Sequence, residues 1–288
     1  MLELAKNIAQ LDQATGLLEE VVILNNASTT NYDSLKQYIS TRPDIPFKYF
    51  DAPSNLGVAR GRNYALARGS APYVIMLDDD AVLQNKNALV NLMEEFNRKC
   101  AERPVAIISF KVLYYDSLAM QENALPHKRY KHFKDKSYFE TYYYAGGAHA
   151  VKRSVMDQVG SYPPDFFYGM EEYDLGYRII DAGYSIIYSD RIVMLHKESP
   201  LGRKPKEEKI RMMWVNKSKV AYRYLPLRYF LSTAVMWSLQ YLKMSGFNVK
   251  GLFRGWSEIA KISSSEKRTP ISKSARQYLR QTKARLWY

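Results

Sequence analysis

Three adjacent aspartates are the residues of this 288-residue sequence most suited to chemistry. Asp78, Asp79 and Asp80 directly follow the apolar run from Tyr73 to Leu77, which predicts a buried strand. In open parallel sheets ligands bind outside the carboxyl ends of the strands, and neighbouring carboxylates repel one another unless a cation lies among them. The triplet therefore indicates either a site for Mg²⁺ or Mn²⁺, which accept oxygen ligands, or a solvated acidic turn.

A second acidic group, Glu171-Glu172-x-Asp174, lies at the start of a predicted helix. Acids in a first helical turn are stabilised by the helix dipole, and Asp174 has a natural partner in Arg178 four residues later, so one interpretation is structural. The other is catalytic, because a carboxylate held ionised at a helix N-terminus can act as a general base.

A histidine ends the last apolar run before the composition changes. His196 follows the predicted strand 192–195, and neutral imidazole is a good ligand for ions of the Mn²⁺ type. A lone histidine at a strand end is usually not a ligand. It becomes one only if the fold brings it to the aspartates.

The elements that must position these groups alternate between strands and helices. Predicted strands lie at 20–24, 47–50, 73–77, 105–110, 184–188 and 192–195. Predicted helices lie at 2–18, 31–39, 55–69, 87–103, 154–159 and 170–182. This order predicts an α/β fold in which a mostly parallel sheet is flanked by helices.

Net charge divides the chain near residue 197. The whole chain carries a formal charge of +13. Residues 1–196 contain 21 Lys and Arg against 24 Asp and Glu, a balance of −3, whereas residues 197–288 contain 21 against 5, a balance of +16. All four tryptophans, Trp214, Trp237, Trp256 and Trp287, lie in the basic part. The two parts are therefore expected to have different tasks.

The remaining composition excludes several classes of protein. A hydrophobic content of 47% excludes disorder as the dominant state, and a single cysteine, Cys100, excludes an intramolecular disulfide and fits a reducing compartment. No stretch approaches the ~20 apolar residues of a membrane-spanning helix, and residues 1–10 do not resemble a secretory signal. We therefore expect a protein that is soluble or lies on a membrane without crossing it.

Five stretches of this sequence occur in a characteristic order. They are Val22–Thr29, Asn55–Asn63, Leu77–Asp80, Gly146-Gly147 with Phe166–Arg178, and His196. In this order they resemble family 2 glycosyltransferases of the GT-A fold, with the rhamnosyltransferase and galactofuranosyltransferase branches the most similar. The resemblance covers about residues 1–197 and implies that sugar moves from a nucleotide-diphosphate sugar to an acceptor hydroxyl with inversion of the anomeric configuration.

The resemblance also implies roles for individual residues. Asp78, Asp80 and His196 would hold Mg²⁺ or Mn²⁺ against the diphosphate. The donor would be contacted by Asn25, Asn26, Arg62, Asp78 and Asp79, with Asn25 and Arg62 at the nucleobase. Glu172 would be the general base, and Glu171 is the second candidate for that role.

Three departures from the family pattern affect these expectations. Asn25 and Glu172 stand where the family usually has Asp, so the base recognition and the reach of the general base are expected to differ. The family's first strand normally precedes the first helix, but here Met1 already opens that helix. Because that strand lies centrally in the sheet, we expect a gap. Either the chain is truncated at its N-terminus or another segment fills the position.

Aromatic and basic side chains alternate through residues 197–288, and three interpretations follow. The segment packs as helices on the catalytic sheet, lies in a membrane interface, or binds nucleic acid. We favour the interface, because Trp, Met and Leu suit it while Lys and Arg meet anionic lipid, and no nucleic-acid motif is present. Exposure of Trp237 and Trp256 beside basic residues would support the membrane; their burial would support packing.

The sequence thus predicts a GT-A-like catalytic domain over residues 1–197 and a basic, aromatic helical extension over residues 198–288. The expected activity is metal-dependent hexosyl transfer in polysaccharide or cell-envelope synthesis, with a nucleotide-sugar donor, a glycan or lipid-linked acceptor, an anionic membrane surface as partner and no nucleic acid. The expected location is cytoplasmic, peripheral at the inner face of the membrane. The alternative is a non-catalytic, membrane-associated glycosyltransferase-like scaffold, which the absent first strand favours and the retained acids oppose.

Overall fold

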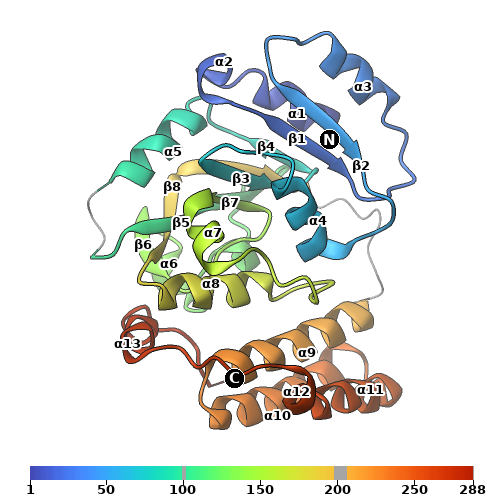
Figure 1. Cartoon of the computed structure of the whole chain (residues 1–288), viewed down its shortest axis with the longest axis vertical. Helices are drawn as coiled ribbons and strands as arrows, with labels where there is room; N and C mark the ends of the chain where they lie inside the picture. The colour runs from blue at the N-terminus through green and yellow to red at the C-terminus, as the bar shows by residue number, and fades with distance from the viewer. Residues whose placement is uncertain (99–101, 198–205, 288) are drawn as a thin grey trace.

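Figure 1 shows the computed structural model, which describes residues 1–98, 102–197 and 206–287. An α/β part occupies the upper region of the view, and helices from the C-terminal part of the chain lie beneath it. Cys100 lies outside the described residues, as does the segment from residue 198 to 205, where the predicted extension begins.

The α/β part alternates strands and helices along the chain. In chain order its elements are α1 (Leu2–Ile8), α2 (Ala14–Leu17), β1 (Val21–Asn25), α3 (Asp33–Ser40), β2 (Phe47–Asp51), α4 (Gly57–Leu66), β3 (Tyr73–Leu77), β4 (Ala81–Leu83), α5 (Ala88–Asn97), β5 (Val105–Tyr114), the 3₁₀ turn η1 (Glu122–Ala124), α6 (Tyr130–Phe133), β6 (Tyr138–Thr141), β7 (Ala148–Lys152), α7 (Arg153–Val159), α8 (Glu171–Asp181) and β8 (Ser185–His196).

The strands form two sheets flanked by helices, which confirms the predicted fold class. In the larger sheet the order is β3-β7-β5-β8-β4, and β6 pairs with β8. The sheets are mixed: β1–β2 and β5–β8 are parallel, and the remaining pairs are antiparallel. Within the described residues no strand joins β1 to β3, so the expected gap is present.

The last strand differs from the sequence-based expectation. The two predicted strands at 184–188 and 192–195 are one strand, β8, which continues through Asp190 and Arg191. A shift in the pairing with β5, between Phe110 and Lys111, accommodates the extra residues as a bulge. The Arg191 side chain is satisfied there by ion pairs with Glu94 and Glu95.

The C-terminal helices pack against the α/β part. They are α9 (Lys206–Tyr224), α10 (Leu227–Met244), α11 (Val249–Ala260), α12 (Ile262–Ser265) and α13 (Lys273–Gln281). Val220 of α9 and Leu279 of α13 share one buried apolar cluster with Leu175 of α8. The Tyr278 hydroxyl lies 3.0 Å from the Thr141 carbonyl oxygen, at the edge of the main sheet. Removing these helices would therefore expose the core of the α/β part.

The burial of the tryptophans decides only in part between packing on the α/β part and attachment to a membrane interface. Trp214 is fully buried among α9, α10 and α11, whereas Trp237 and Trp256 are half-buried against the same helices. Trp287 is exposed. Within the described residues, no helix combines the length and the apolar character that crossing a bilayer requires.

A buried aspartate joins the two parts of the molecule. Asp174 lies in the first turn of α8, and its carboxylate pairs with Arg178 at 2.9 Å and with Arg223 of α9 at 2.8 Å. The Tyr224 hydroxyl donates a further hydrogen bond to it, at 3.0 Å. The structural interpretation of the Asp174–Arg178 pair is thus supported, and the same carboxylate anchors α9 to α8.

Arg223→Met should destabilise the protein by about 3 kcal/mol, the lower end of the cost of breaking a buried ion pair, because Asp174 keeps Arg178 as a partner. The free energy of unfolding in urea measures the effect. Arg280→Met, which removes an exposed arginine from α13, is the matched control and should change stability little. Equal stabilities of the two variants would show that Asp174 does not anchor α9.

Candidate active site

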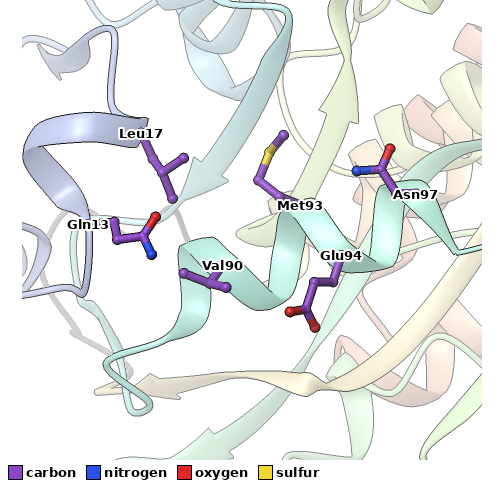
Figure 2. Close-up of a pocket in the computed structure, with 6 residues that line it drawn as sticks. All are labelled: Gln13, Leu17, Val90, Met93, Glu94 and Asn97. Atoms are coloured by element: carbon purple, nitrogen blue, oxygen red, sulfur yellow. The ribbon is translucent and has the colours of Figure 1, made fainter.

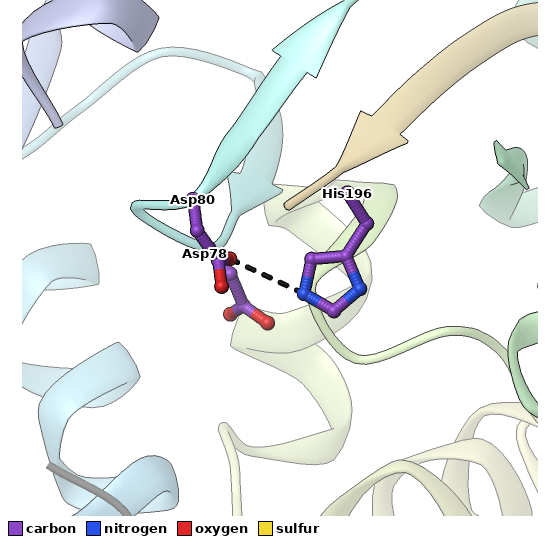
Figure 3. A group of neighbouring side chains, drawn as sticks. All are labelled: Asp78, Asp80 and His196. Atoms are coloured by element: carbon purple, nitrogen blue, oxygen red, sulfur yellow. Dashed lines mark ion pairs between the residues drawn. The ribbon is translucent and has the colours of Figure 1, made fainter. Parts of the chain in front are cut away.

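The short strand β4 explains why Asp80 and His196 meet. β4 pairs antiparallel with the end of β8, so that Ala81 lies opposite His196. The side-chain ligand atoms of Asp78, Asp80 and His196 all lie within 4.8 Å of one another, and Asp80 Oδ1 is 3.2 Å from His196 Nε2. Figure 3 shows both carboxylates and the imidazole converging from the β3–β4 turn and from β8. The structure therefore brings the three predicted metal ligands together.

A buried glutamine sets the orientation of the histidine ring. Gln121 Oε1 lies 2.9 Å from His196 Nδ1. An amide oxygen only accepts hydrogen bonds, so Nδ1 carries the proton and Nε2 keeps its lone pair on the side of Asp80. Such an outer partner fixes the ring of a metal-binding histidine. The sequence contained no signal for Gln121.

Two carboxylates and one imidazole form a donor set that suits a divalent cation. Oxygen ligands fit both Mg²⁺ and Mn²⁺, and the imidazole nitrogen makes the set better suited to Mn²⁺. Asp79 is exposed and is not part of this group. Its predicted contact with the donor stays a prediction.

Arg62 lies between the metal-site candidates and the acidic pair at the start of α8. Its guanidinium nitrogens are 3.1 Å from Glu171, 3.7 Å from Glu172 and 3.9 Å from Asp78. The guanidinium also lies 5.5 Å from the centroid of the Tyr162 ring. The ion pairs of Arg62 are with this acidic group, and its predicted contact with a nucleobase stays a prediction.

The two glutamates differ in access. The Glu171 side chain is 3% exposed and pairs with Arg62, whereas the Glu172 side chain is 18% exposed. Burial raises the pKa of Glu172, the nearby charge of Glu171 raises it further, and Arg62 opposes both effects. A carboxyl group with a raised pKa that remains within reach of a substrate is suited to accept a proton.

Two glycines make room for the acids. A Cβ atom on Gly146 would lie 2.0 Å from Glu172 Oε1, and one on Gly147 would lie 2.1 Å from Asp78 Oδ2. Any side chain at either position would displace a candidate catalytic or metal-binding carboxylate. Glycine is thus needed at positions 146 and 147 because the chain just before β7 passes very close to Glu172 and to Asp78.

The end of β1 holds both of the predicted donor-binding asparagines, and the end of β2 lies beside it. Asn25 Nδ2 donates to Asp51 Oδ1 at 2.9 Å, and the Tyr49 hydroxyl donates to the same oxygen at 3.0 Å. Asn26 instead binds the backbone at the start of α4, where its Oδ1 accepts from Leu56 N at 2.9 Å. Asp51 was missed from the sequence, although it follows a predicted strand as Asp78 does.

A surface pocket of about 350 Å³ lies elsewhere, between α2 and α5 (Figure 2). Leu17, Val90 and Met93 form most of its apolar lining, and its acid, Glu94, pairs with Arg191. It holds no group of catalytic side chains. The site is therefore the acidic group around Arg62, not this pocket.

The model of the family described as glycosyl transferase family 2 matches residues 2–160, more than half of the chain. This chain belongs to glycosyl transferase family 2. The matched range includes the three aspartates, Arg62 and the glycine pair, whereas α8 and His196 lie beyond it.

Two curated proteins are similar to this family 2 chain. An uncharacterized protein of Haemophilus influenzae is 25% identical over 162 residues, 56% of this chain and 86% of that protein. The O-antigen chain rhamnosyltransferase WbaN of Salmonella anatum is 25% identical over 187 residues, 62% of this chain and 57% of that protein. The chain thus spans little more than half the length of WbaN.

Solved structures share the fold at low sequence identity. The mannosyltransferase PcManGT from Pyrobaculum calidifontis, in complex with GDP-Man and Mn²⁺, has a TM-score of 0.56 at 19% identity and covers 99% of this chain and 76% of its own. GalNAc-T7 with UDP, GalNAc and Mn²⁺ has a TM-score of 0.61 at 16% identity and covers 93% and 55%. TarS of S. aureus with UDP-GlcNAc has a TM-score of 0.60 at 13% identity and covers 90% and 76%.

Asp80→Asn should weaken Mn²⁺ binding by this family 2 chain by more than the ~10–100-fold that loss of an outer partner costs, because it removes a charged ligand. Titration with Mn²⁺, followed by the electron paramagnetic resonance of the free ion, measures the affinity. The matched control is Asp135→Asn, which neutralises an exposed carboxylate away from the cluster. Unchanged Mn²⁺ affinity in Asp80→Asn would remove Asp80 from the metal site.

Proposed function

We propose that this chain is a metal-dependent, inverting glycosyltransferase that moves a sugar from a nucleotide-diphosphate sugar to a hydroxyl group of a glycan or lipid-linked acceptor. The observation that carries the proposal is the position of Arg62, which lies 3.9 Å from Asp78 and 3.7 Å from Glu172. One side chain thus separates the candidate metal site from the candidate base. A donor diphosphate and an acceptor hydroxyl bound at these two places would be neighbours.

The similar proteins support the class of donor and of pathway. GDP-Man with Mn²⁺ and UDP-GlcNAc are bound in two of the structures that share this fold. WbaN is named for rhamnosyl transfer to the O-antigen chain. We therefore place this chain in the synthesis of a cell-envelope polysaccharide, on the cytoplasmic side of the membrane where nucleotide sugars are found.

The chain's own residues suit the roles that this reaction requires. Glu172 takes the proton of the acceptor hydroxyl, whose oxygen forms a bond to the anomeric carbon as the bond to the diphosphate breaks on the opposite face. Arg62 favours the ionised form of Glu172, and Glu171 holds Arg62 in place. A divalent cation bound by Asp78, Asp80 and His196 would offset the charge that develops on the departing nucleoside diphosphate.

Glu172→Gln should lower the rate of sugar transfer by at least ~10²-fold while nucleotide-sugar binding persists, because the amide keeps the shape but accepts no proton. A screen of nucleotide sugars with Mn²⁺ and Mg²⁺ identifies the donor on which kcat and KM are then measured. The wild-type rate should fall as the pH drops through the raised pKa of Glu172, above the ordinary value of 4.5, since only the ionised form is a base.

Glu171→Gln tests the second candidate for the general base. Loss of activity in Glu171→Gln, with Glu172→Gln still active, would assign the base to Glu171. The divided sheet favours one alternative, a non-catalytic scaffold, and a wild-type chain that neither transfers nor hydrolyses any nucleotide sugar would support it.

We further propose that α10 and α11 attach the protein to an anionic membrane surface. Of the twelve large apolar side chains that are exposed in the described part of the chain, nine lie between residues 227 and 253, on these two helices and the turn that joins them. Leu227, Leu231, Val235 and Leu239 recur every four residues along one face of α10. Phe247, in the turn that follows, is 74% exposed. An apolar stripe of this kind is typical of interfacial helices.

Charge complements this apolar face. Residues 226–262 carry five basic side chains, Arg228, Lys243, Lys250, Arg254 and Lys261, against one acid, Glu258, and all five basic residues are exposed. Each contributes about 1 kcal/mol of attraction near an anionic surface. The exposed membrane-facing residues are thus aliphatic and Phe, rather than the tryptophans that the sequence pattern suggested.

Phe247→Asp should lower the binding of the protein to vesicles of phosphatidylglycerol and phosphatidylcholine about tenfold, because one large apolar side chain no longer inserts. Cosedimentation measures binding, which should also weaken as salt rises. Leu118→Asp is the matched control, since Leu118 is likewise exposed, has a left-handed backbone, with φ of 54° against 62° for Phe247, and belongs to the connection after β5 rather than to α10 or α11. A wild-type protein that ignores these vesicles at low salt would exclude the membrane, and binding to an oligonucleotide instead would favour nucleic acid.

A further inference from the structure

A lysine without an acidic partner lies beside the helix that carries the candidate base. Lys217 projects from α9, and its Nζ is 5.2 Å from the centroid of the Tyr173 ring and 4.9 Å from that of Trp237. No ion pair or hydrogen bond of this ammonium group occurs within residues 1–98, 102–197 and 206–287. Aromatic faces stabilise a cation but do not neutralise it.

Two further cations act on Lys217. Burial lowers the pKa of the Lys217 amine to about 7, and the charges of Lys128 and Arg285 contribute to the decrease. The pKa of Lys128 is lowered in turn by burial and by Arg285. Lys217 thus lies near other positive charge with no acid among the residues that the structure describes to offset it, an arrangement that an anion would stabilise.

Aromatic side chains line this site and leave one donor unused. The Tyr143 and Tyr173 rings are stacked, with centroids 4.8 Å apart and planes inclined by 10°, and Lys128 Nζ lies 5.5 Å from the Tyr143 centroid. The Trp237 indole Nε1 is buried and has no hydrogen-bond partner among the described residues. A buried donor left unpaired is costly, so the indole N–H also favours an acceptor oxygen at this place.

The position of the site relates it to the acceptor. Tyr173 directly follows Glu172 in α8, and Tyr143 lies three residues before Gly146, which abuts Glu172. The candidate metal site contacts Arg62 through a different residue, Asp78, which lies in the β3–β4 turn. Lys217 therefore lies over the ring of the residue that directly follows the candidate base in α8, on the side where we place the acceptor.

We propose that Lys217, Lys128 and the Trp237 indole form an acceptor subsite for a phosphoryl group, so that the acceptor is a phosphate-linked saccharide. This rests on the proposed function, since the word acceptor presupposes sugar transfer. A phosphoryl group offers several oxygens and more than one negative charge, which matches two cations and an N–H donor better than a single carboxylate does.

Nuclear magnetic resonance of the tryptophan indoles tests the subsite. The full-length protein is labelled with ¹⁵N, the Trp237 resonance is assigned with Trp237→Phe, and inorganic diphosphate is added without divalent cations so that the metal site does not contribute. The Trp237 indole resonance should shift to saturation. Lys217→Met should weaken this binding at least about tenfold, as expected for loss of a charge-assisted hydrogen bond.

The control is Lys136→Met, which removes a lysine that also lies over an aromatic ring, Phe133, outside the site. It should leave diphosphate binding unchanged. A Trp237 resonance that does not move, or that moves equally in Lys217→Met, would overturn the subsite. Glucose 1-phosphate should bind at least as tightly as inorganic phosphate, and its exclusion would overturn the assignment to a sugar-bearing acceptor.

Hydrolysis of the nucleotide sugar, measured with Mn²⁺ on the wild type and on the control Lys136→Met, separates the two proposals. Both proteins should hydrolyse the donor equally, and the subsite predicts an increased KM for a phosphate-linked acceptor in Lys217→Met alone. Hydrolysis without any Trp237 shift would overturn the subsite alone. No hydrolysis by the wild type would contradict the proposed function, and with it the acceptor role of the site.

Discussion

The charge of Arg62 is the constraint on which this site depends. Three carboxylates, from Glu171, Glu172 and Asp78, lie within 3.9 Å of its guanidinium. Carboxylates this close, two of them largely removed from water, would repel one another strongly without a cation between them. Hydrogen bonds to the backbone also keep the helix that carries Arg62 in position. Asn63, one residue along α4, exchanges two hydrogen bonds with the backbone of Tyr162, at 2.8 and 3.0 Å, and so fixes α4 against the segment that leads into α8.

The C-terminal helices hold this arrangement from the other side. Asn216 of α9 donates to the carbonyl oxygens of Tyr168 and Gly169, at 3.1 and 3.0 Å, in the loop that leads to Glu171. Arg223 also pairs with Asp165 and Glu266, so that one arginine ties this loop, α8 and the segment after α12 together. The basic C-terminal part of the chain therefore holds α8 and the loop before it in place, in addition to forming the exposed surface of α10 and α11. Part of its positive charge is neutralised by ion pairs within the molecule, such as those of Arg223.

The sequence predicted those site residues whose position follows from where a strand or helix ends. Asp78 and Asp80 follow a predicted strand, His196 ends one, and Glu171 and Glu172 begin a helix, so local pattern and family resemblance pointed to them. Gln121 and the contacts of Arg62 depend on tertiary register, which no local pattern encodes. For the tryptophans the sequence pattern suggested a role that the packing does not bear out for every residue. Their composition suggested an exposed belt, but packing among α9, α10 and α11 covers Trp214 fully and its neighbours in part, while aliphatic side chains face outward.

Helix α10 relates the two binding surfaces that we propose. Trp237 points toward Lys217, whereas Leu231, Val235 and Leu239 lie on the far side of the same helix. The phosphoryl subsite is thus about one helix diameter, ~10 Å, from the apolar face that would enter the lipid boundary. A phosphate attached to a lipid lies just outside that boundary, at the level of the headgroups. An acceptor held in this way would reach the subsite from the membrane with its sugar directed at Glu172, while a freely diffusing nucleotide sugar approaches the metal site from the solvent.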